Sequence, residues 1–130
     1  MFKLPEDDLK YQWTNHVKDK MVYYGISESL IKRIVKFPKR VEGGVAPKTV
    51  AVMQPGSNKK KPTEIWVMYQ SVGGGLTDKS SPSIGGLKNK FDITIEKKKI
   101  ISAWRYPGIS PVGKKIPIPD EILQELESII

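Results

Sequence analysis

The chain has 130 residues, with 22 Lys and Arg against 14 Asp and Glu, which gives a formal net charge of +8. This is the length of one ordinary domain, so we expect a single domain over residues 1–130. The absence of cysteine excludes disulfides, thiolate metal sites and thiol nucleophiles. No apolar run approaches the roughly 18 residues that a membrane-spanning helix needs, and the acidic start Met1–Asp8 is unlike a signal peptide. The sequence therefore predicts a cytoplasmic protein that does not contact a membrane.

The charge balance indicates an anionic partner. With a pI near 9.6, the commonest partner of this kind is a nucleic acid, so we expect RNA or another polyanion. The alternative is a soluble protein with scattered lysines, because Lys-rich surfaces also serve solubility alone.

The first predicted helix follows a polar lead-in over residues 1–12. Thr14 or Asn15 is suited to cap its free N–H groups, and Gly25 is suited to close it in a left-handed conformation. Two lines of side chains recur at helical spacing. The apolar line is Trp13, Val17, Met21 and Tyr24. A second line, beside the apolar face, consists of His16, Lys20 and Tyr23.

A second helix is predicted directly afterwards. Ser27 is a good N-cap, Ile26 and Ile31 are spaced as a hydrophobic staple, and Pro38 ends the helix. Its apolar face is Leu30, Ile31, Ile34 and Val35.

Strands dominate the next part of the chain. Apolar runs over 49–54 and 64–70 predict an antiparallel hairpin with an exposed basic loop. Residues 71–90 are rich in Gly and Ser, which is typical of a flexible linker, so we expect an insertion within the domain.

A further strand is predicted over 91–106, followed by a last helix that opens at Pro119-Asp120. Two structures are compatible with residues 91–106: one long strand, or a small hairpin that turns at Lys97–Lys99. We favour one strand, because the turn has no Gly, Asn or Asp. The order of elements predicts an α+β fold, with two N-terminal helices packed on a three- to four-stranded antiparallel sheet and a C-terminal helix.

Two segments resemble known families. The pattern H-x-x-x-K-M of His16–Met21, then Gly25-Ile26-Ser27 and the stop at Pro38, is similar to the opening of a family of small uncharacterised bacterial domains. Residues 99–105 are similar to the R-I-I-S-A-R strand of BrnT-type ribonuclease toxins. Both groups resemble the wider RelE/barnase-like class. The resemblance implies helices packed on an antiparallel sheet and the activity of a toxin–antitoxin endoribonuclease, with an antitoxin protein as a further partner.

Metal-independent RNA cleavage requires an acid, a base and cations for the phosphorane. The resemblance implies His16 as the proton carrier, with Lys20 and Arg105 stabilising the charge. The alternatives are that His16 packs or binds substrate, and that Arg105 forms a salt bridge with Glu64 or another carboxylate. The alternative to an enzyme is a non-catalytic module that binds nucleic acid or protein and has the same fold.

Several residues could bind RNA. Aromatic rings stack on bases, and lysines bind the phosphate backbone independently of the base sequence. The candidates are Tyr69, Trp104, Tyr106, Lys59, Lys60 and Lys61. The alternatives are a buried Trp104 and solvated lysines. One histidine and no cysteine fall short of the usual zinc ligand set, so we predict no metal or other cofactor.

Alternation divides the last strand into two faces. Ser102, Trp104 and Tyr106 fall on one face. Ile101, Ala103 and Arg105 fall on the other, where Arg105 would point toward the first helix and His16.

Overall fold

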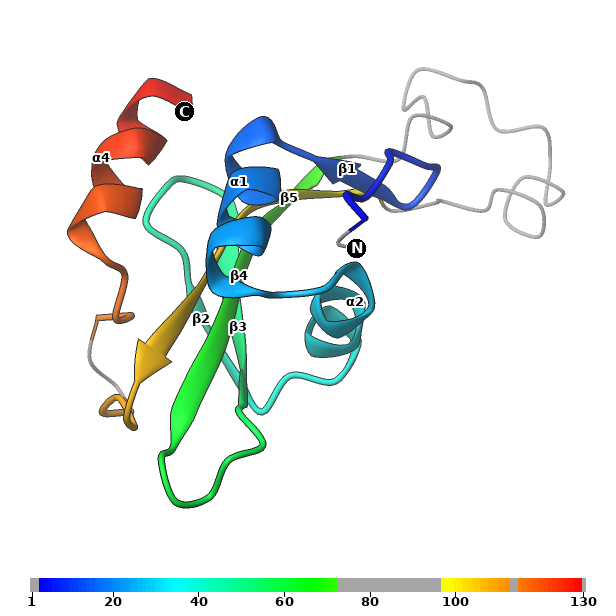
Figure 1. Ribbon diagram of the computed structural model, residues 1–130. Helices are drawn as coiled ribbons and strands as arrows, with labels where there is room; N and C mark the ends of the chain where they lie inside the picture. Colours follow the sequence, from blue (N-terminus) through cyan, green and yellow to red (C-terminus); the bar gives the residue numbers. More distant parts are fainter. Residues whose placement is uncertain (1–2, 73–96, 113–114, 130) are drawn as a thin grey trace, which may run out of the picture.

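The computed structural model describes residues 3–72, 97–112 and 115–129, and these form an α+β fold (Figure 1). In chain order, the elements are β1 Tyr11–Trp13, α1 Asn15–Tyr24, α2 Glu28–Lys36, β2 Arg40–Gly43, β3 Thr49–Pro55, β4 Thr63–Val72, β5 Lys97–Pro107 and α4 Asp120–Ile129. The predicted fold class, the two N-terminal helices, the hairpin of β3 and β4 and the final helix are confirmed.

The sheet is larger than predicted, and it is mixed. Its five strands lie in the order β1-β5-β4-β3-β2. The pairs from β2 to β5 are antiparallel, whereas β1 is parallel to β5. The prediction of a purely antiparallel sheet of three to four strands was therefore wrong, because the short edge strands β1 and β2 were missed.

Strand β1 forms inside the stretch that was expected to be a loose lead-in. Two acidic side chains hold its backbone: Asp8 Oδ1 accepts from the N–H groups of Lys10 and Tyr11, and Asp7 Oδ1 accepts from Trp13 N–H. These backbone hydrogen bonds lower the pKa of the Asp8 carboxyl. With only three residues, β1 is too short to show the alternation of apolar and polar residues by which a strand is predicted from sequence.

The caps predicted for the two N-terminal helices are confirmed. The Thr14 hydroxyl accepts from Val17 N–H and donates to the carbonyl of Ile101 on β5. Gly25 has a left-handed φ of 67°, and Ser27 Oγ accepts from Leu30 N–H. Thr14 therefore begins α1 and also fixes it against the sheet.

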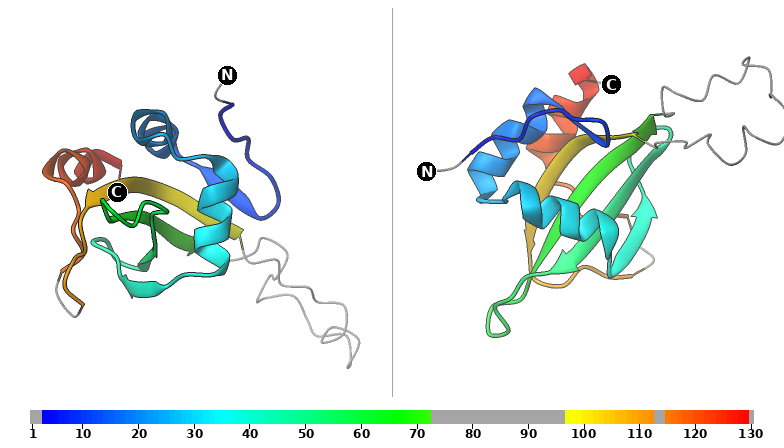
Figure 2. Two further views of the ribbon diagram at one scale, coloured as in Figure 1. Left: turned by 60° about the horizontal axis from the view of Figure 1, so that its bottom comes forward. Right: turned by 90° about the vertical axis from the view of Figure 1, so that its right-hand side faces the viewer.

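Two apolar clusters fill the space on either side of the sheet. The first lies under α1 and α2 and includes Ile26, Ile31, Val67 and Ile100, all of them buried. The second joins the opposite face to the C-terminal segment and α4, through Trp66, Trp104, Ile116, Ile122 and Leu126. Figure 2 shows α1 and α2 across one face, with the C-terminal segment passing round the sheet to reach α4 beside α1.

A β-bulge interrupts the alternation of β5. Tyr69 of β4 pairs with Ile100 and Met68 pairs with Ser102, so Ile101 is the extra residue. Ile101 consequently packs in the second cluster while Ala103 packs in the first. The prediction that these two residues share a face was wrong, because a bulge changes the face of every residue on one side of it.

Two predictions concern the segment before β5. Lys97–Lys99 pair with β4 as part of one continuous strand, so they do not form a hairpin turn. The strand predicted over 91–95 and nearly all of the flexible insertion predicted over 71–90 lie outside the described residues; Ser71 and Val72 end β4.

We predict that Thr14→Ala lowers the free energy of unfolding by about 1–2 kcal/mol, because it removes an N-cap and a hydrogen bond to β5 together. Thr14→Ser retains the hydroxyl and should lose much less. Urea denaturation of both variants measures the difference. Equal losses in the two variants would contradict the assignment to the hydroxyl.

Candidate functional site

His16 lies at the centre of a hydrogen-bonded network that joins three elements. Its Nδ1 is 2.9 Å from Glu125 Oε2 on α4, and its Nε2 is 2.8 Å from Ser102 Oγ on β5. Lys20, one turn along α1, donates to the other oxygen of Glu125 at 2.8 Å. The structure thus brings together two of the three predicted catalytic residues, His16 and Lys20, through a carboxylate that the sequence analysis did not single out.

Burial favours the neutral form of the His16 imidazole. Burial lowers the pKa of His16 below its ordinary value near 6.5, and this effect outweighs the opposing influence of Glu125. A neutral ring that donates from Nδ1 to the carboxylate accepts at Nε2 from the Ser102 hydroxyl. The hydrogen bond from Lys20 lowers the pKa of Glu125, and the same contact raises the pKa of Lys20.

Hydroxyl, imidazole and carboxylate follow one another here in the order of a serine hydrolase relay. However, Ser102 is 0% exposed and His16 is 6% exposed. A nucleophile must reach its substrate, and this hydroxyl is enclosed between β5, α1 and α4. In this conformation the network is therefore structural: it connects α1 to β5 and to α4.

The third predicted catalytic residue, Arg105, has a different role. Its Nε donates to the carbonyl of Tyr24 at 2.8 Å, and its Nη2 donates to the carbonyl of Gly25 at 3.1 Å. A cation at these carbonyls satisfies free acceptors and complements the helix dipole at the C-terminus of α1. The alternative of a salt bridge from Arg105 to Glu64 was wrong.

His16 and Arg105 are bound to opposite ends of α1. His16 is in the first turn, whereas Arg105 contacts the residue that ends the helix, eight positions later. At a rise of about 1.5 Å per residue, the two contact points are about 12 Å apart. Two groups that act on one phosphate must both approach it closely, so the structure does not unite the three predicted catalytic residues.

The aromatic residues predicted to bind RNA are dispersed. Trp104 is 0% exposed and stacks on Trp66, with ring centroids 6.2 Å apart, so no base can reach it. Tyr69 lies beside Lys98, whose Nζ is 6.0 Å from the ring centroid. Tyr106 packs against the second cluster at the other end of the strand pair. These three rings do not form one surface.

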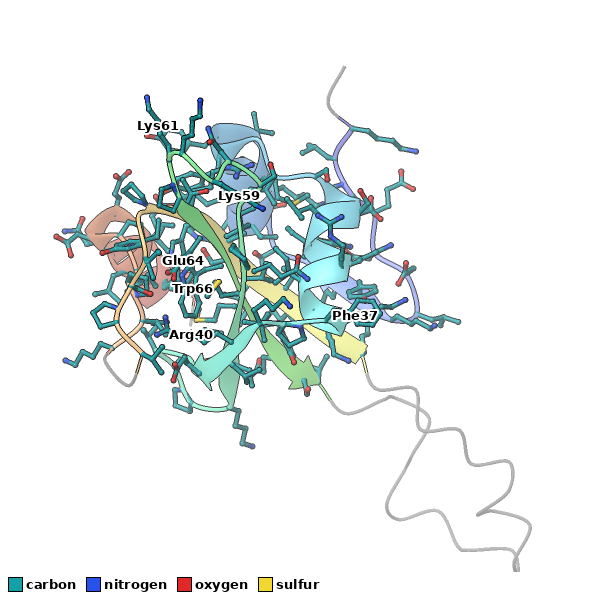
Figure 3. The ribbon with its side chains drawn as sticks, turned by 90° about the horizontal axis from the view of Figure 1, so that it is seen from below. Phe37, Arg40, Lys59, Lys61, Glu64 and Trp66 are labelled. Carbon is teal, nitrogen blue, oxygen red and sulfur yellow. The ribbon has the colours of Figure 1, made fainter. Side chains whose placement is uncertain are left out.

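A second polar network was missed entirely. The carboxylate of Glu64 is buried and accepts from Trp66 Nε1, Ser110 N–H and Ser110 Oγ. Arg40 lies over the Trp66 ring at 5.0 Å and donates to the Ser110 hydroxyl and to the carbonyls of Ser110 and Pro111. Figure 3 shows Arg40, Glu64 and Trp66 converging. This network binds the loop after β5 to the edge strand β2.

The lysines of the β3–β4 hairpin are exposed, as predicted. Asn58 Oδ1 accepts from the N–H groups of Lys60 and Lys61, and Gly56 N–H donates to the carbonyl of Thr63. Among the described residues, no carboxylate lies within ion-pair distance of Lys59, Lys60 or Lys61. The loop therefore presents three uncompensated cations on an ordered backbone.

The other lysine run lies elsewhere. Lys97–Lys99 pair with the end of β4, and the hairpin loop precedes its start. Since β4 has 10 residues, the two runs are about 30 Å apart along the sheet. Lys97–Lys99 are also partly buried, so the hairpin loop is the stronger candidate for an anion-binding surface.

Within the described ranges, no group of three or more His, Cys, Asp or Glu side chains is placed to hold a metal ion. The helices of that part of the chain are too short or too polar to cross a membrane. Comparison of the chain with protein-family models, curated proteins and solved structures found no match.

We predict that the protein becomes less stable as the pH falls from about 7.5 to 5.5. Because the folded state lowers the pKa of His16, the unfolded chain binds a proton more readily, and stability is lost below the unfolded pKa near 6.5. His16 is the one histidine of the chain, so His16→Gln should flatten this dependence. Urea midpoints at each pH test this, and a wild type that gains stability toward pH 5.5 would contradict it.

Proposed function

We propose that this protein binds RNA through the β3–β4 hairpin loop. The observation that carries the proposal is the set of exposed, uncompensated lysines Lys59, Lys60 and Lys61 on an ordered loop. Cations that face solvent release counterions when they meet a phosphate backbone, which is the main source of affinity for nucleic acids. The net charge of +8 favours the same partner by attracting polyanions at long range.

The fold is compatible with a relation to the RelE/barnase-like class. Its support is the packing of two N-terminal helices against one face of the antiparallel strands β3, β4 and β5. Under this proposal the parallel strand β1 is an addition at the sheet edge. The resemblance at Lys99–Arg105 falls on β5, an interior strand that lies between β1 and β4.

Binding without cleavage is the form of the proposal that the geometry favours. Both nitrogens of His16 have internal partners, and Arg105 is engaged with the carbonyls of α1. The contact of His16 and Lys20 with one carboxylate is the observation that favours the second candidate, a metal-independent endoribonuclease. An assay in EDTA separates the two.

We predict that Lys59→Gln combined with Lys61→Gln weakens binding to a fluorescently labelled oligouridine. The slope of log affinity against log salt should decrease in magnitude by about 1.4, at about 0.7 for each lost phosphate contact. Fluorescence anisotropy between about 50 and 200 mM salt measures both quantities. The matched control is Lys10→Gln with Lys48→Gln, which removes the same charge from exposed positions at the other end of the sheet.

Equal losses in the two double variants would show only a general effect of charge, and absence of binding by the wild type would refute the proposal. The RNA recovered from each titration should be intact on a denaturing gel. Shortened RNA formed in EDTA by the wild type and absent with His16→Gln would instead establish the endoribonuclease.

A further inference from the structure

We propose that the RNA-binding surface continues from the hairpin loop to the end of α2, where Phe37 stacks on a base of single-stranded RNA. This inference rests on the proposed function and specifies its ligand. Phe37 follows the last residue of α2 and is 68% exposed. A single exposed phenylalanine is unremarkable in itself, so its surroundings must carry the argument.

The two chain segments that meet beside Phe37 are rich in cations. No carboxylate occurs between Glu28 and Glu42, and none occurs from Met53 to Thr63. The two segments contribute six exposed cations that have no ion pair among the described residues: Arg33, Lys36, Lys39, Lys59, Lys60 and Lys61. Two further cations of the first segment do form ion pairs: Lys32 pairs with Glu28, and Arg40 pairs with Glu42 and Glu64.

Gln54 joins the two segments. Its Nε2 donates to the carbonyl of Phe37 at 2.7 Å and lies 3.4 Å from the carbonyl of Arg33. Gln54 is near the end of β3, and five residues of chain span at most about 18 Å, so Lys59 lies within that distance of it. Figure 3 looks at this end of the molecule, with Phe37 where α2 ends and Lys59 and Lys61 on the hairpin loop.

The backbone around Phe37 is fixed before any ligand arrives. Phe37 N–H donates to Arg33 O at 2.8 Å, and Lys39 N–H donates to Met53 O at 2.8 Å. An aromatic ring on a backbone that is already ordered loses little conformational entropy on binding. The ring therefore forms a ready platform among cations.

An aromatic platform within a basic groove or surface is the usual arrangement for single-stranded nucleic acids. The ring stacks on a base while the cations contact the phosphates on either side. Bases of an RNA duplex are already stacked within the helix and are unavailable to the ring. The surface should therefore prefer a single strand to a duplex of the same length.

The test compares Phe37→Ala with Tyr23→Ala, a change at an aromatic residue of α1 that is 70% exposed and outside this surface. We expect Phe37→Ala to weaken binding to oligouridine at least about fivefold, the lower end of the range for one stacked base. Tyr23→Ala and Phe37→Trp should bind as the wild type does. The salt slope should be unchanged in Phe37→Ala, because no charge is lost.

The outcomes separate this inference from the function on which it rests. If the wild type does not bind RNA, the proposed function fails. The stacking inference alone is overturned if Lys59→Gln with Lys61→Gln weakens binding but Phe37→Ala does not, or if a duplex binds as tightly as the single strand. Unchanged urea midpoints for Phe37→Ala confirm that the fold is intact, as expected for an exposed ring.

Discussion

The fold depends on satisfying a buried imidazole. A buried polar group without a partner costs more than its hydrogen bond would contribute, so each nitrogen of His16 needs a partner, one from β5 and one from α4. Ser102 reaches the ring from the position directly after the bulge in β5. Helix α4 in turn must present Glu125 on the side that faces α1. One side chain thereby links a strand and two helices.

Local signals were sufficient for most of the helices and for the hairpin. Thr14, Gly25 and Ser27 act within a few residues of themselves, so their roles could be predicted from the sequence. Strands β1 and β2 could not be predicted, because strands of three and four residues depend on partners far away in the chain. The bulge at Ile101 likewise arises from pairing with β4, which alternation within one strand cannot reveal.

The same division applies to the candidate site. The exposed lysines at 59–61 and the shared side of His16 and Lys20 followed from composition and helical spacing. The partner of Arg105 could not be predicted, because it is a main-chain carbonyl, and every residue type has one. Phe37 was passed over for a related reason: its exposure is decided by where α2 ends against β3, and its basic neighbours come from two separate segments.

The order of strands also constrains how the chain folds. Strand β5 follows the other four strands of the sheet along the chain, yet it lies between β1 and β4, and α1 packs on it. Thr14 and Ile101, which are hydrogen-bonded, are 87 positions apart. At about 5–20 residues per second, a ribosome needs about 4–17 s to separate their synthesis. During that interval α1 lacks the β5 residues that cover part of its apolar face in the folded protein. Contacts this distant in sequence also form slowly. The nascent chain must therefore stay soluble until β5 has been synthesised and has paired with β4.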